Sequence, residues 1–157
     1  MNKRTALEFV HVELKKDTWG DPGFKVASVH EAYDAIKHLI KCRDREMVIQ
    51  LNLAMNGRVI NASVVSIGNV NSSIMDPAGI IRTALLSGAP RIIVFHNHPS
   101  GCALPSDVDQ KAAKRLAGAV NLMGLTLDDF VIIGDEDVYS MSDYDRESLD
   151  PVMMAAE

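Results

Sequence analysis

Residues 91–109 of the chain read RIIVFHNHPSGCALPSDVD, which places a strand, a loop and the start of a helix in immediate succession. The apolar, β-branched run 91–95 predicts a buried strand. His96 and His98 then lie at or just beyond the end of that strand. Two prolines and a glycine within 99–105 force the chain into a loop. The two histidines are therefore expected at the edge of a sheet.

The helix that follows the loop brings a carboxylate back toward the histidines. Ser106 is a good N-cap, so Asp109 falls in the first turn of a helix expected to end at Gly124. With His96 and His98, Asp109 completes the three-ligand set of an open catalytic zinc site, whose fourth position is left to water. Simpler explanations exist, since short histidine pairs also occur as loop features and helix dipoles favour first-turn carboxylates without any metal.

The spacing of these residues resembles a known metalloprotease signature, His-x-His-Pro-x6-Ser-x2-Asp, of the JAB/MPN family. Residues 96–106 and 66–73 are similar to the RadC-like branch of that family, and the resemblance covers roughly residues 29–145. It implies an α/β fold with three layers, α/β/α, around a mixed sheet of the cytidine-deaminase-like kind. Interspersed strands and helices on a chain of 157 residues predict the same three-layer arrangement.

The family also needs a glutamate at the start of an upstream strand, and Glu46 stands at such a position. In the segment 47–53 apolar residues alternate with Gln50 and Asn52, which predicts a half-buried strand. At its beginning, Glu46 could face the attacking water and take its proton. Considered without the resemblance, Glu46 would be a solvated charge beside the charged run 43–45.

The resemblance implies a zinc metallopeptidase of the JAMM type, which hydrolyses a peptide or isopeptide bond in a protein or peptide substrate. His96, His98 and Asp109 would bind Zn²⁺, and Glu46 would pass the proton of water to the leaving amine. In this family Ser106 would donate a hydrogen bond to the developing oxyanion. Its hydroxyl oxygen is also the helix N-cap, and both roles stay open because the proton and the lone pairs are distinct.

The chain departs from the RadC-like pattern at two positions. Residues 76–79 read Asp-Pro-Ala-Gly where the family usually has His-Pro-Arg-Glu, so a binding role of that arginine or glutamate is not expected here. Cys102 stands where the family usually has aspartate. Its thiol either contacts the metal at times, or Cys102 serves only as a small residue of the loop. We also expect the chain to lack the N-terminal helical segment of longer RadC proteins.

Three other functions compete with amide hydrolysis. A non-catalytic, metal-stabilised interaction domain linked to DNA repair or metabolism would tolerate loss of Glu46. A phosphodiesterase commonly needs two metals bridged by several carboxylates, and only Asp107 lies near enough in sequence. A zinc deaminase needs His-x-Glu and a later Pro-Cys-x-x-Cys, which the chain does not have. The complete ligand set together with Glu46 and Ser106 favours the hydrolase.

Composition predicts a single compact domain in the cytoplasm. Hydrophobic residues make up 47% and charged residues 24%, which are ordinary globular values. No apolar run approaches a membrane span, and the N-terminus lacks the apolar stretch of a signal peptide. Cys42, in a predicted helix, and Cys102, in the loop, are the only cysteines. A disulfide framework is therefore not expected, and a reducing compartment is.

The charge distribution speaks against a general nucleic-acid binder. The net charge of -5 provides no basic field for indiscriminate binding. One local cluster of cations surrounds a predicted helix end and comprises Lys37, His38, Lys41, Arg43 and Arg45. Helix dipoles favour cations there, so the cluster is interpreted first as a solvated face and second as a patch for nucleic acid or an acidic partner. The oligomeric state cannot be predicted from the sequence.

The chain is expected to divide into an N-terminal strand and linker (1–27), the RadC-like domain (28–145) and a polar, mobile tail (146–157). The N-terminal strand is predicted at residues 9–14. Local signals predict the remaining elements, namely a capped helix from Ser28, a hairpin turn at Asn56–Gly57, a helix between Asp76 and Gly88, and strands at 130–133 and 138–141.

Overall fold

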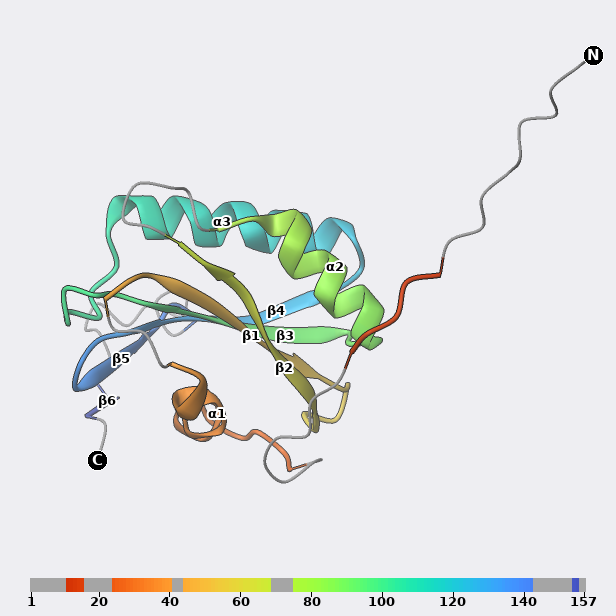
Figure 1. The fold of residues 1–157 in the computed structure, drawn as a ribbon, viewed down its shortest axis with the longest axis horizontal. Helices are drawn as coiled ribbons and strands as arrows, with labels where there is room; N and C mark the ends of the chain where they lie inside the picture. Colours follow the sequence, from red (N-terminus) through yellow and green to blue (C-terminus); the bar gives the residue numbers. More distant parts are fainter. Residues whose placement is uncertain (1–10, 16–23, 41–43, 69–74, 143–153, 156–157) are drawn as a thin grey trace, which may run out of the picture.

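The computed structural model of the chain describes residues 11–15, 24–40, 44–68, 75–142 and 154–155. They form a six-stranded mixed sheet between helices, which confirms the predicted three-layer α/β/α fold (Figure 1). Along the chain the elements are α1 (Val29–Ile36), the 3-10 helix η1 (Lys37–Leu39), β1 (Met47–Leu53), β2 (Val59–Ile67), α2 (Pro77–Ser87), β3 (Arg91–Asn97), α3 (Asp107–Leu122), β4 (Thr126–Ile133), β5 (Asp137–Ser140) and β6 (Met154–Ala155).

The order of the strands brings the ends of three central strands to one edge of the sheet. The order is β2-β1-β3-β4-β5-β6, and every neighbouring pair is antiparallel except β3 and β4. Helix α3 joins this parallel pair, because parallel strands need a crossover connection. The ends of β3 and β4 therefore share an edge with the beginning of β1, where the sequence places the two histidines and Glu46.

Two hydrophobic clusters fix the helices on the two faces of the sheet. One cluster contains Val48, Val94 and Leu116 and lies between the sheet and helices α2 and α3. The other contains Ile49 and Phe95 with residues of α1 and lies on the opposite face. Figure 1 shows α2 and α3 over one face and α1 against the other. Alternate residues of the central strands thus pack on opposite sides, as the pleat of a strand requires.

Strand β1 is wholly buried, and the prediction that it is half-buried was wrong. Gln50 and Asn52 are both 0% exposed, because β1 lies between β2 and β3 and is covered on both faces. A chain of amides satisfies most of their polar atoms. Gln50 Nε2 donates to Asn52 Oδ1 at 2.7 Å, and Asn52 Nδ2 donates to Asn61 Oδ1 at 2.6 Å. The alternating polar residues Gln50 and Asn52 therefore belong to a buried hydrogen-bond network and not to a solvated face of the strand.

The helix caps and the hairpin turn follow the local signals. Asp76 accepts hydrogen bonds from the first turn of α2, Pro77 is its first residue, and Gly88 ends it with φ of 64°. Ser28 caps α1 by accepting from Glu31 N at 3.2 Å. Gly57, with φ of 80°, allows the tight turn between β1 and β2. These elements are set by nearest neighbours in sequence.

The ends of the chain differ from expectation where they are described. Residues 11–15 form no strand, so the strand predicted at 9–14 is wrong for its described part, and Val12 is 70% exposed with no sheet to cover it. Residues 24–26 instead run beside the start of β2, where Val59 N donates to Phe24 O at 2.9 Å. Strand β6 was not anticipated within 146–157, and the rest of that predicted tail lies outside the described residues, as do Cys42 and residues 69–73.

None of the helices in the described parts of the chain combines the length and the apolar character needed to cross a membrane.

Candidate metal centre

The three predicted ligands converge at the shared edge of the sheet. His96 is near the end of β3, His98 is the first residue beyond it, and Asp109 lies in the first turn of α3. His98 N donates to Ile133 O at 2.9 Å, which extends the pairing with β4 and fixes the residue. One possible ligand atom from each of the three side chains lies within 4.8 Å of the others. Their burial is substantial, since the side chains of His96, His98 and Asp109 are 7%, 14% and 13% exposed.

The separations between these atoms fit a single divalent metal ion. His96 Nε2 is 3.7 Å from Asp109 Oδ1, and His98 Nε2 is 3.4 Å from Asp109 Oδ2. Donor atoms bound to one tetrahedral zinc at about 2.0–2.2 Å would lie about 3.3–3.6 Å apart. Two imidazole nitrogens and one carboxylate oxygen are also a donor set that zinc accepts. The group could therefore hold a metal with little rearrangement.

Backbone contacts orient the His98 ring. Its Nδ1 donates to the carbonyl oxygen of Cys102 at 2.8 Å, so in the neutral ring Nε2 carries the lone pair that faces Asp109. The His96 ring stands nearly perpendicular to it, with centroids 5.0 Å apart. His96 Nδ1 is buried and makes no hydrogen bond of ordinary geometry, although the backbone of Met47 lies close enough to raise the pKa of the ring.

Cys102 takes part through its carbonyl and not through its thiol. The residue is exposed, and its sulfur does not belong to the group of atoms that could hold a metal. The small-loop-residue interpretation is the one that fits this placement. Asp107 is likewise exposed and outside the group, so no second carboxylate joins Asp109 there among the described residues.

Electrostatics prepare the site for a cation. Burial, with a smaller contribution from His98, lowers the pKa of His96 to about 4, so this ring is neutral at pH 7. The hydrogen bond to Asp109 raises the pKa of His98. Burial pushes the pKa of Asp109 upward, but hydrogen bonds from His98 and Ser106 outweigh it and hold that pKa well below its usual value. At neutral pH the ionised carboxylate of Asp109 thus lies beside the neutral ring of His96 and beside His98, which binds a proton more readily than a free histidine.

Ser106 is the N-cap of α3, as predicted, and it is also hydrogen-bonded to Asp109, one of the three possible metal ligands. Asp109 N donates to Ser106 Oγ at 3.2 Å, which is the capping bond. In return, Asp109 Oδ2 accepts from Ser106 N at 2.8 Å and from Ser106 Oγ at 2.5 Å. The two residues form a capping box in which aspartate takes the place usual for glutamate. Asp109 Oδ1 is left facing His96.

Glu46 stands directly before β1, near enough to His98 and Asp109 for both to act on the pKa of its carboxyl. Val48 pairs with His96 in the sheet, so Glu46, two residues earlier, has the same parity as the His96 ring. The carboxyl group is partly buried, and burial raises its pKa. Asp109 adds to this rise, while His98 opposes it. The carboxyl of Glu46 is therefore less solvated than an ordinary surface carboxyl and interacts with two of the three possible metal ligands.

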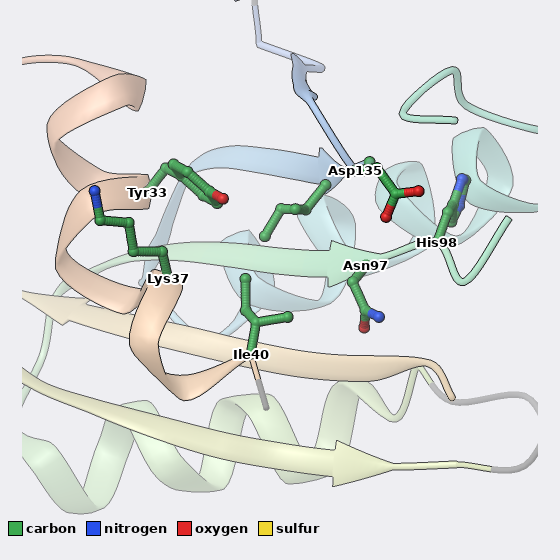
Figure 2. A pocket seen from close by; sticks show the side chains of 8 residues that line it. Tyr33, Lys37, Ile40, Asn97, His98 and Asp135 are labelled. Atoms are coloured by element: carbon green, nitrogen blue, oxygen red, sulfur yellow. The ribbon is translucent and has the colours of Figure 1, made fainter. Parts of the chain in front are cut away.

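Asn97 is a residue of the site for which the sequence analysis proposed no role. Its side chain is buried and reaches across to β1, as Figure 2 shows. Met47 N donates to Asn97 Oδ1 at 2.6 Å, and Asn97 Nδ2 donates to Arg45 O at 3.1 Å. The available signal was a polar residue between two histidines. Its partners lie about fifty residues earlier in the chain, where no local pattern points to them.

A small cavity lies beside His98, between η1 and the ends of β3 and β4 (Figure 2). Its volume is about 40 Å³, enough for a few waters or a small side chain. It is lined by Tyr33, Lys37, Ile40, Asn97, His98, Ile133, Gly134 and Asp135. The cavity thus connects the α1 side of the sheet edge with one of the metal ligands.

The predicted cluster of cations is partly neutralised by neighbouring carboxylates. Lys37 Nζ lies 2.7 Å from Asp34 Oδ1, and Arg45 lies 3.1 Å from Asp44. Lys41 and Arg43 are outside the described residues. The described part of the cluster is therefore a solvated face with internal ion pairs.

Comparisons with known proteins agree with this geometry. The model of the RadC-like JAB domain family matches residues 26–147. A UPF0758 protein of Methanosarcina mazei is 32% identical over 123 residues, which are 78% of this chain and 54% of that protein. A UPF0758 protein of Caldanaerobacter subterraneus is 34% identical over 122 residues, covering 78% and 52% of the two chains. One from Listeria monocytogenes is 41% identical over 93 residues, covering 59% and 42%.

The chain spans about half the length of the curated relatives it matches most extensively. The matched region contains all three possible metal ligands, Glu46 and Ser106. By the extent of the family match and by the fold, the chain belongs to the RadC-like JAB domain family.

Proposed function

We propose that this protein is a zinc-dependent hydrolase that cleaves a peptide or isopeptide bond in a protein or peptide substrate. The observation that carries the proposal is the convergence of His96, His98 and Asp109 with the partly buried carboxyl of Glu46 at one edge of the sheet. Three protein ligands and a separate carboxylate are what hydrolysis by an activated water requires. A structural site would have four protein ligands and no need of the fifth group.

The three ligands would hold Zn²⁺. When bound, the ion would lower the pKa of water toward neutrality and polarise the substrate carbonyl. His96 is suited to this role because its pKa of about 4 leaves the ring unprotonated. Asp109 supplies the negative charge, and the carbonyl of Cys102 keeps the Nε2 atom of His98 turned toward it.

Glu46 would serve as the general base. It accepts a proton from the attacking water and delivers it to the nitrogen of the leaving amine as the carbon–nitrogen bond breaks. Its raised pKa favours this exchange, because a carboxyl that is partly desolvated binds a proton more readily than an exposed one. Its position beside His98 and Asp109 is the support for this assignment.

Ser106 would stabilise the oxyanion that forms on the substrate carbonyl. Its hydroxyl proton is directed at Asp109 Oδ2, so it must rotate away from that oxygen to reach a substrate. Ser106 is exposed, which leaves room for this rotation. The cavity of about 40 Å³ beside His98 offers a place for a small group of the substrate.

We further propose a cytoplasmic location and a protein partner in place of a nucleic acid. The exposed thiol of Cys102 is free, a state that a reducing compartment maintains. The net charge of -5 and the ion pairs of Lys37 and Arg45 leave little basic surface for a phosphate backbone.

The decisive experiment compares the new peptide termini that zinc-loaded protein and its Glu46→Gln variant generate in a proteome. Branched peptides from isopeptide bonds are scored beside linear ones. We expect products that need both zinc and Glu46. Identical termini with the two proteins, or none with either, would exclude the hydrolase and leave a metal-stabilised interaction domain.

A further inference from the structure

We infer that Asn97, the residue between the two histidine ligands, positions Glu46 by holding the backbone on both sides of it. The inference rests on the proposed function in one respect, namely that Glu46 is the general base. Asn97 itself makes no contact with the reacting atoms in this scheme. It is a positioning residue that ties the base to the strand that carries the metal ligands.

The hydrogen bonds of Asn97 bracket Glu46 in the sequence. Its Oδ1 accepts from Met47 N at 2.6 Å, and its Nδ2 donates to Arg45 O at 3.1 Å. The two partners are the residues immediately after and immediately before Glu46. The Asn97 amide therefore holds the two peptide groups on either side of the Glu46 Cα. By holding them, it also fixes the direction in which the Glu46 side chain leaves the backbone.

The sheet explains why a side chain is needed at this point. The ladder between β1 and β3 ends at the pair Val48 and His96. Beyond that pair β3 keeps its pairing with β4, and His98 N donates to Ile133 O at 2.9 Å. Met47 lies past the last pair between β1 and β3, and its N–H donates to the side chain of Asn97, which Figure 2 shows directed toward β1.

A third bond holds Glu46 from the other side. Gly68 N, just beyond β2, donates to Glu46 O at 3.0 Å. The base is thus fastened to β2 through its own carbonyl and to β3 through Asn97. The ladder between β1 and β3 also joins these strands, but its last pair, Val48 and His96, lies two residues from Glu46. Asn97 extends the connection to the residues on both sides of Glu46.

The chemistry of the position calls for an amide. Asn97 is 6% exposed, so each of its polar atoms needs a partner. An aspartate could accept from Met47 N but would turn a lone pair toward Arg45 O. An alanine would make neither bond. Because a misplacement of about 1 Å in a catalytic group costs about 10²-fold in rate, loss of this support should be visible in turnover.

The test uses Asn97→Ala and Asn97→Asp, with Asn52→Ala as the matched control. Asn52 is also a buried amide at a central strand, and its partners Gln50, Asn61 and Ser87 lie away from the metal ligands. We expect both Asn97 variants to bind one zinc per chain and to lose about 10²-fold in kcat with KM changed less than twofold. Asn52→Ala should lose stability to a similar degree and keep its kcat.

A second measurement does not need activity. Crystal structures of the parent and of the Asn97 variants give the distances from the Glu46 carboxyl to the possible ligand atoms of His98 and Asp109. In the Asn97 variants these distances should lengthen, because the peptide groups on both sides of Glu46 are no longer held by one amide. Asn97→Asp retains the Met47 bond and replaces Asn97→Ala if the latter does not fold.

The outcomes separate the two proposals. A protein without zinc-dependent hydrolysis refutes the proposed function, and the position of Glu46 in the crystal structures then decides alone whether Asn97 positions it. Loss of zinc from the Asn97 variants would overturn the inference, because Asn97 would then support the ligands and not the base. So would a kcat no lower than in Asn52→Ala, or a Glu46 carboxyl that keeps its position in the Asn97 variants.

Discussion

The hydroxyl of Ser106 donates to Asp109 Oδ2 at 2.5 Å, and Asp109 N donates back to Ser106 Oγ at 3.2 Å. The cap of α3 and a candidate metal ligand are therefore one hydrogen-bonded unit. The bond occupies Oδ2 and orients Oδ1 toward His96, so the helix start presents its carboxylate in a fixed rotamer. Any change at residue 106 acts on the helix and on the ligand together.

Ser106→Asp should destabilise the protein and weaken zinc binding. At an ordinary N-cap, aspartate is as good as serine and suits the helix dipole. Here the new carboxylate would face the Asp109 carboxylate, which has no proton to share at neutral pH. The measurement is the melting temperature with and without zinc, and Ser106→Thr, which keeps the hydroxyl, is the control. A variant that melts as high as the parent would show that the two carboxylates do not meet.

Ser106→Ala separates capping from catalysis. Loss of the cap should cost about 1 kcal/mol of unfolding free energy. Loss of an oxyanion donor should lower turnover by about 10²-fold. Denaturant unfolding and steady-state kinetics on one cleavable peptide give the two values. A destabilised variant with full turnover would restrict Ser106 to the helix cap.

Zinc should bind in a ratio of about one ion per chain through the two imidazoles and Asp109. Elemental analysis and X-ray absorption should give nitrogen–metal distances of about 2.0–2.1 Å. His96→Gln should abolish binding. Cys102→Ser should bind zinc normally, because Cys102 contacts His98 through its backbone carbonyl. Stoichiometric iron in chelator-free preparations would contradict the choice of metal, and zinc loss in Cys102→Ser would contradict the ligand set.

Glu46→Gln should retain zinc and melt at or slightly above the temperature of the parent. Burial raises the pKa of the Glu46 carboxyl, because the charged form loses part of its solvation in the folded protein. A neutral amide at this position avoids that loss of solvation free energy. Turnover should fall by about 10²-fold or more, the usual contribution of a general base. Calorimetry and kinetics on the same preparation provide the comparison. An unfolded or metal-free variant would make Glu46 a structural residue.

The metal-free protein should be most stable near pH 6.5. The pKa of His96 is about 6.5 in the unfolded chain and about 4 in the folded protein. Between pH 6.5 and pH 4 the unfolded chain therefore binds a proton at His96 that the folded protein does not bind. The free energy of unfolding should fall by about 3 kcal/mol as the pH is lowered through this range. The pKa of His98 is raised, so its contribution is complete below about 6.5 and is lost as pH rises through its folded value. Urea unfolding of metal-free protein across this range tests both slopes.

His96→Gln should remove the acid slope of that profile, whereas His30→Gln, a change in α1, should leave it in place. An acid slope of equal size in His96→Gln would assign it to other groups. Zinc should abolish the decline on the alkaline side, because the ion binds the neutral form of His98.

Local signals in the sequence predicted most of the central elements and the three residues that could hold a metal ion. Caps and turns at Ser106, Asp76 and Gly57 depend on bonds between residues two to four positions apart, and their residue types state them directly. The run before His96 was apolar enough to specify a buried strand. The spacing from His98 to Asp109 then allowed a strand end and a helix start to meet, and the structure brings them together as predicted.

Tertiary structure decided what depends on residues far apart in the chain. The alternation of Gln50 and Asn52 with apolar residues suggested a strand with one solvated face. In the structure β1 is a central strand, and the neighbouring strands and helices bury both of its faces. Asn97 bonds to residues about fifty positions away because β1 and β3 are neighbours in the sheet. The sequence thus names the groups that could carry the chemistry, and the pairing of strands sets the distances between them.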